Sequence, residues 1–158
     1  MGDGLLEEIY IPSHLKSIGG QCFHNCSNLK KVHIASIRSW LSIIFDAALT
    51  NPVYFSHKLY IDNQLVTSVE VPQDIYSIPN YAFYSCTDIT NVTFHNDITS
   101  IGNYAFYGCT NASFNAIPSS ITTIGEYAFY NCTVQQNLTI GNNSTIGGYA
   151  FAYAKGIY

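Results

Sequence analysis

The chain has 158 residues, of which 47% are hydrophobic and 15% aromatic, while only 10% carry a charge. This length fits about one domain with a buried core, and the aromatic content excludes a disordered chain. A net charge of −4 argues against nucleic-acid binding, because phosphate recognition needs a basic surface. The sequence contains no apolar run long enough for a membrane span. The start MGDGLLEEIYIP does not resemble a signal peptide, so we expect an intracellular chain or one without its leader.

The first predicted element is a strand over residues 6–11, where Leu6, Ile9 and Ile11 follow the pattern apolar-x-x-apolar-x-apolar. The last three residues alternate between apolar and polar positions, which is typical of a half-buried strand. Further copies of this pattern occupy residues 29–34, 66–71, 89–94 and, more weakly, 112–117 and 135–140. The sequence therefore predicts a series of short strands that repeats along the chain.

A nine-residue block lies between the strand patterns. Its copies are IGGQCFHNC from Ile18, IPNYAFYSC from Ile78, IGNYAFYGC from Ile101, IGEYAFYNC from Ile124 and IGGYAFAYA from Ile146. The copies from Ile78 onward start 23 residues apart, except that the last starts one residue early. The glycine column at residues 102, 125 and 147 predicts a bend with positive φ, although Pro79 takes the same column. The Tyr-Ala-Phe-Tyr segment predicts a short helical turn that neighbouring coils must hold in place.

The period is broken between residues 35 and 65, and we expect one longer coil within residues 35–71. The segment LYIDNQLVT predicts a β-hairpin that turns at Asp62 and Asn63. We expect Trp40 to pack inside this coil, with a recognition loop as the alternative. No single coil can bury its apolar side, so the repeats predict a solenoid that is stabilised by stacking.

The segment IPxxLxxIGxxCFxxCxxLxxVxI, from Ile11 to Ile34, resembles the BspA-like (type 5) leucine-rich repeats, and the later IGxxAFxxC copies match as well. The resemblance extends from Leu6 to Phe151. It implies an α/β repeat solenoid, rich in β structure: a right-handed leucine-rich-repeat solenoid of about six coils. We expect a parallel strand ladder on one face and short helical turns on the other. Residues 1–158 should form a single domain that is a fragment of a longer array.

The same resemblance implies a function. Members of this family are secreted or surface-exposed proteins associated with adhesion and protein binding, without a known catalytic centre. We therefore expect a non-catalytic protein-binding module of a secreted or cell-surface protein, with adhesion or host interaction as its role. The alternative is an intracellular or phage-type inhibitor that covers the surface of a partner protein. The ligand should be a protein or a glycan, and no nucleic acid, cofactor or metal is expected.

Phenylalanine and cysteine residues recur at fixed columns, and we expect them to form a structural ladder inside the solenoid. Its members are Phe23, Phe83, Phe106, Phe129, Phe151, Cys26, Cys86, Cys109 and Cys132. A disulfide between adjacent rungs and a zinc site are the less favoured alternatives, because parallel Cβ vectors do not converge and only Cys22 and Cys26 form a close pair. The five histidines share no metal-binding spacing and are expected at the surface. No catalytic residues are predicted.

The best binding candidates lie on the strand face, where the side chains between the apolar positions point outward. They are Tyr10, Lys31, His33, Ser68, Glu70, Asn91, Thr93, Phe114, Asn137 and Thr139. Stacked strands would arrange these side chains in rows on one surface, and Tyr10 and Phe114 are its large exposed anchors. The alternative is a merely solvated face. Two tyrosine columns, which flank the phenylalanines, are expected to be structural, with a contact surface as the alternative.

The ends of the array carry no charged capping segment. Solenoids whose ends are not capped expose a core edge. We therefore expect either a longer array or end-to-end self-association of this chain.

Overall fold

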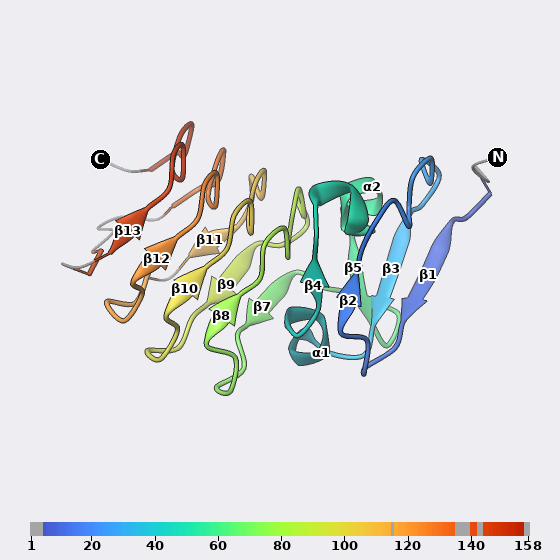
Figure 1. Ribbon diagram of the computed structural model, residues 1–158, viewed down its shortest axis with the longest axis horizontal. Helices are drawn as coiled ribbons and strands as arrows, with labels where there is room; N and C mark the ends of the chain where they lie inside the picture. Colours follow the sequence, from blue (N-terminus) through green and yellow to red (C-terminus); the bar gives the residue numbers. More distant parts are fainter. Residues whose placement is uncertain (1–4, 115, 135–139, 142–143, 157–158) are drawn as a thin grey trace.

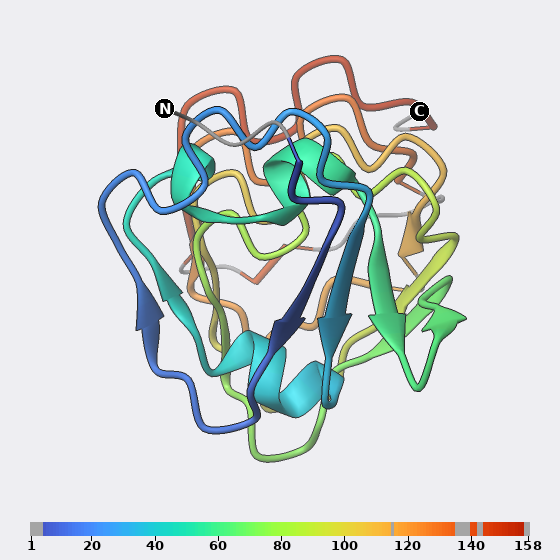
Figure 2. The same ribbon diagram turned by 90° about the vertical axis from the view of Figure 1, so that its right-hand side faces the viewer.

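The computed structural model describes residues 5–114, 116–134, 140–141 and 144–156. Short coils of chain are stacked along the long axis of the molecule, with β1 near one end and β13 near the other (Figure 1). Viewed along the stack, successive coils lie over one another around a common interior (Figure 2). The predicted solenoid is therefore confirmed, and its core is a single cluster of buried side chains that runs through the coils.

The apolar-x-x-apolar-x-apolar segments form the first strand ladder. Its strands are β1 (Glu8–Ile11), β3 (Lys31–Ile34) and β5 (Leu59–Ile61) in one sheet, and β7 (Ser68–Glu70), β9 (Asn91–Thr93) and β11 (Ser113–Phe114) in another. These strands pair in parallel, so that Ile9 lies opposite Val32, and Val69 lies opposite Val92. Strand β6 (Gln64–Leu65) pairs antiparallel to β5, which confirms the predicted hairpin.

A second ladder, which the sequence analysis did not predict, runs along another side of the solenoid. Its strands are β2 (Ser17–Ile18), β4 (Ile44–Phe45), β8 (Ser77–Ile78), β10 (Ser100–Ile101), β12 (Thr123–Ile124) and β13 (Thr145–Ile146). Each strand is only two residues long, and the buried isoleucine alternates with an outward serine or threonine in β8, β10 and β12. These pairs become strands because stacking brings the backbone of the next coil within hydrogen-bonding distance.

The Tyr-Ala-Phe-Tyr segments form tight turns and not the predicted helical turns. Tyr104 and Tyr127 adopt left-handed φ values of 56° and 55°. The backbone N–H of Tyr104 donates to Glu126 in the next coil at 2.8 Å, and Phe106 donates to Ala128 at 2.9 Å. These bonds between coils satisfy groups that a helix would have paired within the coil.

The glycine column also differs from the prediction. Gly102, Gly125 and Gly147 are not among the residues with positive φ. A Cβ atom on Gly102 would lie 2.6 Å from the backbone nitrogen of Asn80 in the preceding coil. Glycine is required at this column because adjacent backbones approach too closely for a side chain, not because the bend is left-handed.

The long coil contains the helices α1 (Ile37–Leu41) and α2 (Val53–Ser56), with the 3-10 helix η1 (Ala48–Thr50) between them. The predicted interior position of Trp40 is confirmed, because its side chain is fully buried. Its indole Nε1 donates to the carbonyl oxygen of Ala82 at 2.8 Å. The equivalent carbonyl in the next coil, that of Ala105, accepts the backbone N–H of Phe83. Trp40 thus supplies from a side chain the donor that a regular coil supplies from its backbone.

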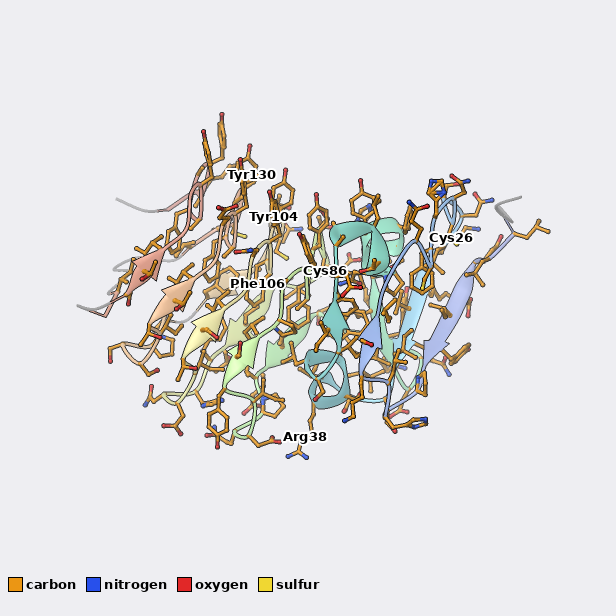
Figure 3. The ribbon with its side chains drawn as sticks, in the orientation of Figure 1. Cys26, Arg38, Cys86, Tyr104, Phe106 and Tyr130 are labelled. Carbon is orange, nitrogen blue, oxygen red and sulfur yellow. The ribbon has the colours of Figure 1, made fainter. Side chains whose placement is uncertain are left out.

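The phenylalanines of the later coils stack in one file inside the solenoid. The ring centroids are 5.3 Å apart for Phe83 and Phe106, 5.5 Å for Phe106 and Phe129, and 5.2 Å for Phe129 and Phe151. In the first coil Phe23 is buried as well. The file joins the core of each coil to that of the next (Figure 3).

All five cysteines are free thiols. Cys86, Cys109 and Cys132 are buried, whereas Cys26 is half-buried. The Cys109 thiol donates to the carbonyl oxygen of Phe83 in the preceding coil at 2.9 Å. Burial raises the pKa of the Cys132 thiol to about 12 and that of Cys109 well above its ordinary value.

Candidate ligand-binding surface

The predicted outward side chains fall into two groups. Tyr10, Lys31 and His33 lie on the sheet formed by β1, β3 and β5. The sheet formed by β7, β9 and β11 carries the others that the structure describes, namely Ser68, Glu70, Asn91 and Thr93. Asn137 and Thr139 lie outside the described residues.

Phe114 is not an exposed anchor, and that part of the prediction is wrong. Its side chain is 1% exposed, and its ring centroid lies 5.1 Å from that of Phe106 and 4.9 Å from that of Phe129. Strand β11 pairs Phe114 with Val92, a spacing of 22 residues and not 23. A shift of one residue moves a side chain to the other face of a strand, and burial of the large phenylalanine ring favours this register.

The outer face of the first sheet carries a row of three rings, which we call the aromatic row: Tyr10, His33 and Tyr60. Parallel pairing places Tyr10 opposite His33, and His33 opposite Tyr60. The Tyr10 and His33 rings are 4.2 Å apart between centroids and inclined by only 7°, and Tyr60 lies 5.4 Å from His33. The strand register therefore builds an ordered aromatic surface from three separate coils.

Two histidines expected at the surface are buried. His33 is only 7% exposed, because Tyr10 and Tyr60 flank its ring. His95 is 9% exposed, and its Nε2 lies 2.9 Å from the carbonyl oxygen of Ile75. Tyr60 was missed as a member of the surface, because the irregular length of the long coil hides its alignment with His33.

Charged groups border the aromatic row. The Lys31 ammonium lies 2.5 Å from Glu8 Oε1, and His33 Nε2 lies 3.2 Å from Glu8 Oε2. The hydrogen bond from Lys31 holds the pKa of Glu8 below its ordinary value, and the same bond raises the pKa of Lys31. Both groups are therefore charged at neutral pH. The Lys31 ammonium also lies 5.9 Å from the centroid of the Tyr60 ring.

A hollow opens at each end of this surface. The first, which we call the Tyr10 hollow, has a volume of about 320 Å³. Its lining residues are Tyr10, Ile11, Pro12, Ser13, His33, Ile34, Ala35, Asp62 and Asn63. The second, which we call the lysine hollow, has a volume of about 480 Å³. Its lining residues are Ser27, Leu29, Lys30, Lys31, Phe55, Ser56, Lys58 and Tyr60. The surface thus offers two chemically distinct places to hold a ligand.

The other repeated faces carry shorter polar side chains or already paired rings. On β10 and β8, Ser100 donates a hydrogen bond to Ser77 at 2.7 Å. In the tyrosine columns, Tyr104 stacks on Tyr127 at 4.8 Å and Tyr107 on Tyr130 at 4.9 Å, so each ring covers its neighbour (Figure 3). Among the described residues, no three His, Cys, Asp or Glu side chains are grouped so as to hold a metal ion.

Short coils stacked in parallel strand ladders define the protein as a leucine-rich-repeat solenoid. The family model described as "BspA type Leucine rich repeat region (6 copies)" matches residues 2–64 and 53–157. The chain therefore belongs to the BspA-type leucine-rich repeat family, as the sequence resemblance predicted. In the part of the chain that the structure describes, no helix has the length and apolar character needed to cross a membrane.

Two solved structures are similar to this chain. A leucine-rich repeat protein from Bacteroides ovatus is 17% identical, with a TM-score of 0.49, over 99% of this chain and 50% of its own. A leucine rich cell surface protein from Faecalibacterium prausnitzii is 23% identical, with a TM-score of 0.43, over 82% of this chain and 38% of its own. The chain thus spans half or less of the length of these two proteins. The comparison with curated proteins finds no match.

Proposed function

We propose that this chain is a non-catalytic binding module of a secreted or cell-surface protein, and that it serves adhesion or host interaction. The ligand is a protein partner, which contacts the outer face of β1, β3 and β5. The observation that carries the proposal is the aromatic row with its bordering charges. The resemblance to a family of surface-exposed binding proteins supports the same role.

The aromatic row has the properties of an interaction site. Tyrosine contributes a large contact area at a small cost in conformational entropy, and it is enriched in binding hot spots. Tyr10 is 69% exposed, yet its ring is held parallel to His33 at 4.2 Å. A side chain that is ordered before binding loses little freedom when a ligand arrives.

The neighbouring charges favour contact with a polar partner. Lys31 and Glu8 are paired with each other and partly exposed, so each retains hydrogen-bonding capacity toward solvent. Charges at the rim of an interface steer association and set its orientation more than they set its affinity. We therefore assign the affinity to the aromatic row and the orientation to the Glu8–Lys31 pair.

The test is binding of the labelled chain to arrays of extracellular-matrix proteins and of glycans. The variant Tyr10→Ala/Tyr60→Ala removes both outer rings of the row, and we expect it to weaken each specific signal by about tenfold or more. The matched control Ser68→Ala/Ser77→Ala changes exposed polar side chains on the two ladders elsewhere. Equal binding by both variants and the unaltered chain would contradict the proposal.

A further inference from the structure

We infer that the Tyr10 hollow binds a neutral sugar residue, so that the module recognises the glycan carried by its partner. This inference rests on the proposed function of the same surface and specifies the chemistry of the ligand.

The ring of Tyr10 provides a stacking platform. One side of the ring is covered by His33, whose Nε2 lies 3.2 Å from Glu8 and whose other neighbour is Tyr60. The tyrosine remains 69% exposed, so the rest of its surface is open to a ligand. The C–H groups on one face of a pyranose carry partial positive charge, and they pack against the negative face of an aromatic ring.

Polar groups stand opposite this platform. Asp62 and Asn63 form the turn between β5 and β6, and both adopt left-handed conformations with φ values of 48° and 62°. A tight hairpin turn of this kind has a fixed shape. The carboxylate of Asp62 accepts hydrogen bonds, while the amide of Asn63 and the hydroxyl of Ser13 can both donate and accept. Adjacent sugar hydroxyls require this mixture of donors and acceptors.

The charge of the hollow selects a neutral sugar. Its only formally charged side chain is that of Asp62, and its lining residues include no lysine or arginine. A sulfated, phosphorylated or sialylated sugar would meet this carboxylate without a compensating cation. The lysines of the lysine hollow are engaged by carboxylates, with Lys30 at 3.1 Å from Glu7 and Lys58 at 3.8 Å from Asp88.

The size of the hollow distinguishes a sugar from a protein surface. A volume of about 320 Å³ suits one or two pyranose rings. A specific protein interface covers roughly 800 Å² on each partner, so direct contact with a protein would extend over Lys31 and Tyr60 as well. Binding confined to Tyr10, Ser13 and the β5–β6 turn is therefore expected for a sugar, and a broader footprint for a protein.

The test is saturation-transfer difference NMR of the full chain with N-acetyllactosamine, cellotetraose, mannotriose and sialyllactose as separate probes. We expect at least one neutral probe to bind, and Tyr10→Ala and Asp62→Ala each to weaken that binding by about tenfold. Tyr10→Phe should retain it, because the aromatic face is kept. Tyr153→Ala is the matched control, since Tyr153 is 74% exposed on a distant coil. Its far-ultraviolet circular dichroism and that of each variant report whether the fold is intact.

Three results would overturn the inference. They are the absence of binding by all three neutral probes, binding that Tyr10→Ala leaves unchanged, and a preference for sialyllactose. The proposed function is tested separately by removing glycans enzymatically from any array protein that the chain captures. Capture that depends on Tyr10 but survives deglycosylation would keep the proposed function and reject the sugar. Loss of capture on deglycosylation would support both.

Discussion

The two halves of the solenoid are built by different rules. In the later coils the same side chains recur at the same columns, as in the file of Phe83, Phe106 and Phe129. In the earlier half a long coil interrupts the repeat, and five of the six lysine and arginine residues lie within the first 58 positions. The regular half satisfies itself through stacking, whereas the irregular half presents distinct rings and charges to solvent. In this protein the departures from the repeat mark the candidate binding surface.

The largest expected effect tests whether the irregular half depends on a single joint. We expect Trp40→Ala to destabilise the protein by about 3–5 kcal/mol, because it empties a buried site and leaves the Ala82 carbonyl without its donor. Urea unfolding followed by circular dichroism measures the change. Trp40→Phe refills much of the volume without the N–H, and it should cost about 1–3 kcal/mol. A change below 1 kcal/mol for both variants would show that the joint is dispensable.

The second effect tests the register of the regular half. Phe114→Ala should cost about 3–4 kcal/mol, because the ring packs between Phe106 and Phe129. Thermal unfolding reports the loss. If Phe114 faced solvent, as the 23-residue spacing predicts, the same substitution would be nearly neutral.

The third effect concerns how closely the coils approach one another. Gly125→Ala would place a Cβ 2.6 Å from the backbone carbonyl carbon of Gly102, so we expect a cost of about 1–3 kcal/mol. Gly148→Ala is the matched control, since a Cβ there meets no heavy atom within 4 Å. The difference between the two variants in urea midpoint measures the close approach alone. Equal midpoints would mean that the coils can separate without penalty.

The fourth effect is a fall in stability at alkaline pH that comes from the regular half. Burial raises the pKa of Cys132 to about 12, whereas an unfolded thiol has a pKa of about 8.5. Above that pH the unfolded chain binds fewer protons than the folded one, so each such thiol removes about 1.4 kcal/mol per pH unit until its folded pKa is reached. The stabilisation is therefore complete below about pH 8.5.

The measurement is urea unfolding at several pH values between 8 and 11. Cys132→Ala should reduce the slope of stability against pH, because one buried thiol is lost. Cys22→Ala is the control, since Cys22 is exposed, and it should leave the slope unchanged. Identical slopes for both variants would assign the alkaline loss to other groups.

The smallest effect on stability should come from the candidate surface. Tyr10→Ala removes a ring that is 69% exposed and is expected to change the free energy of unfolding by less than about 0.5 kcal/mol. The same variant should lose ligand binding. A large loss of stability would instead make Tyr10 a packing residue, and the contrast between the two halves would then be weaker.

The sequence predicts the solenoid well because its two signals reinforce each other. Alternation at Ile9 and Ile11 indicates a strand, and the 23-residue spacing to Val32 and Ile34 indicates stacking. The second ladder escapes prediction because strands of two residues, such as Ser100–Ile101, are too short to show alternation. They exist because a neighbouring coil supplies their partners.

The candidate surface is predicted only in part. Tyr10, Lys31 and His33 follow from alternation, whereas Phe114 fails because the coil is one residue shorter at that strand. Tyr60 could not be aligned with His33, since 27 residues separate them where the repeat would place 23. The burial of His33 arises from both neighbouring coils, so it is a property of the stack and not of its own strand.

The hydrogen bond from the Trp40 indole to Ala82 has a consequence for how such arrays can change. A coil of unequal length breaks the backbone ladder at its boundary, and an unpaired carbonyl there would oppose insertion. A single tryptophan repairs that boundary from a distance of 42 residues in sequence. Solenoids of this kind can therefore be spliced with segments of foreign stride wherever one long side chain reaches across the seam, which makes such seams natural places to graft new loops.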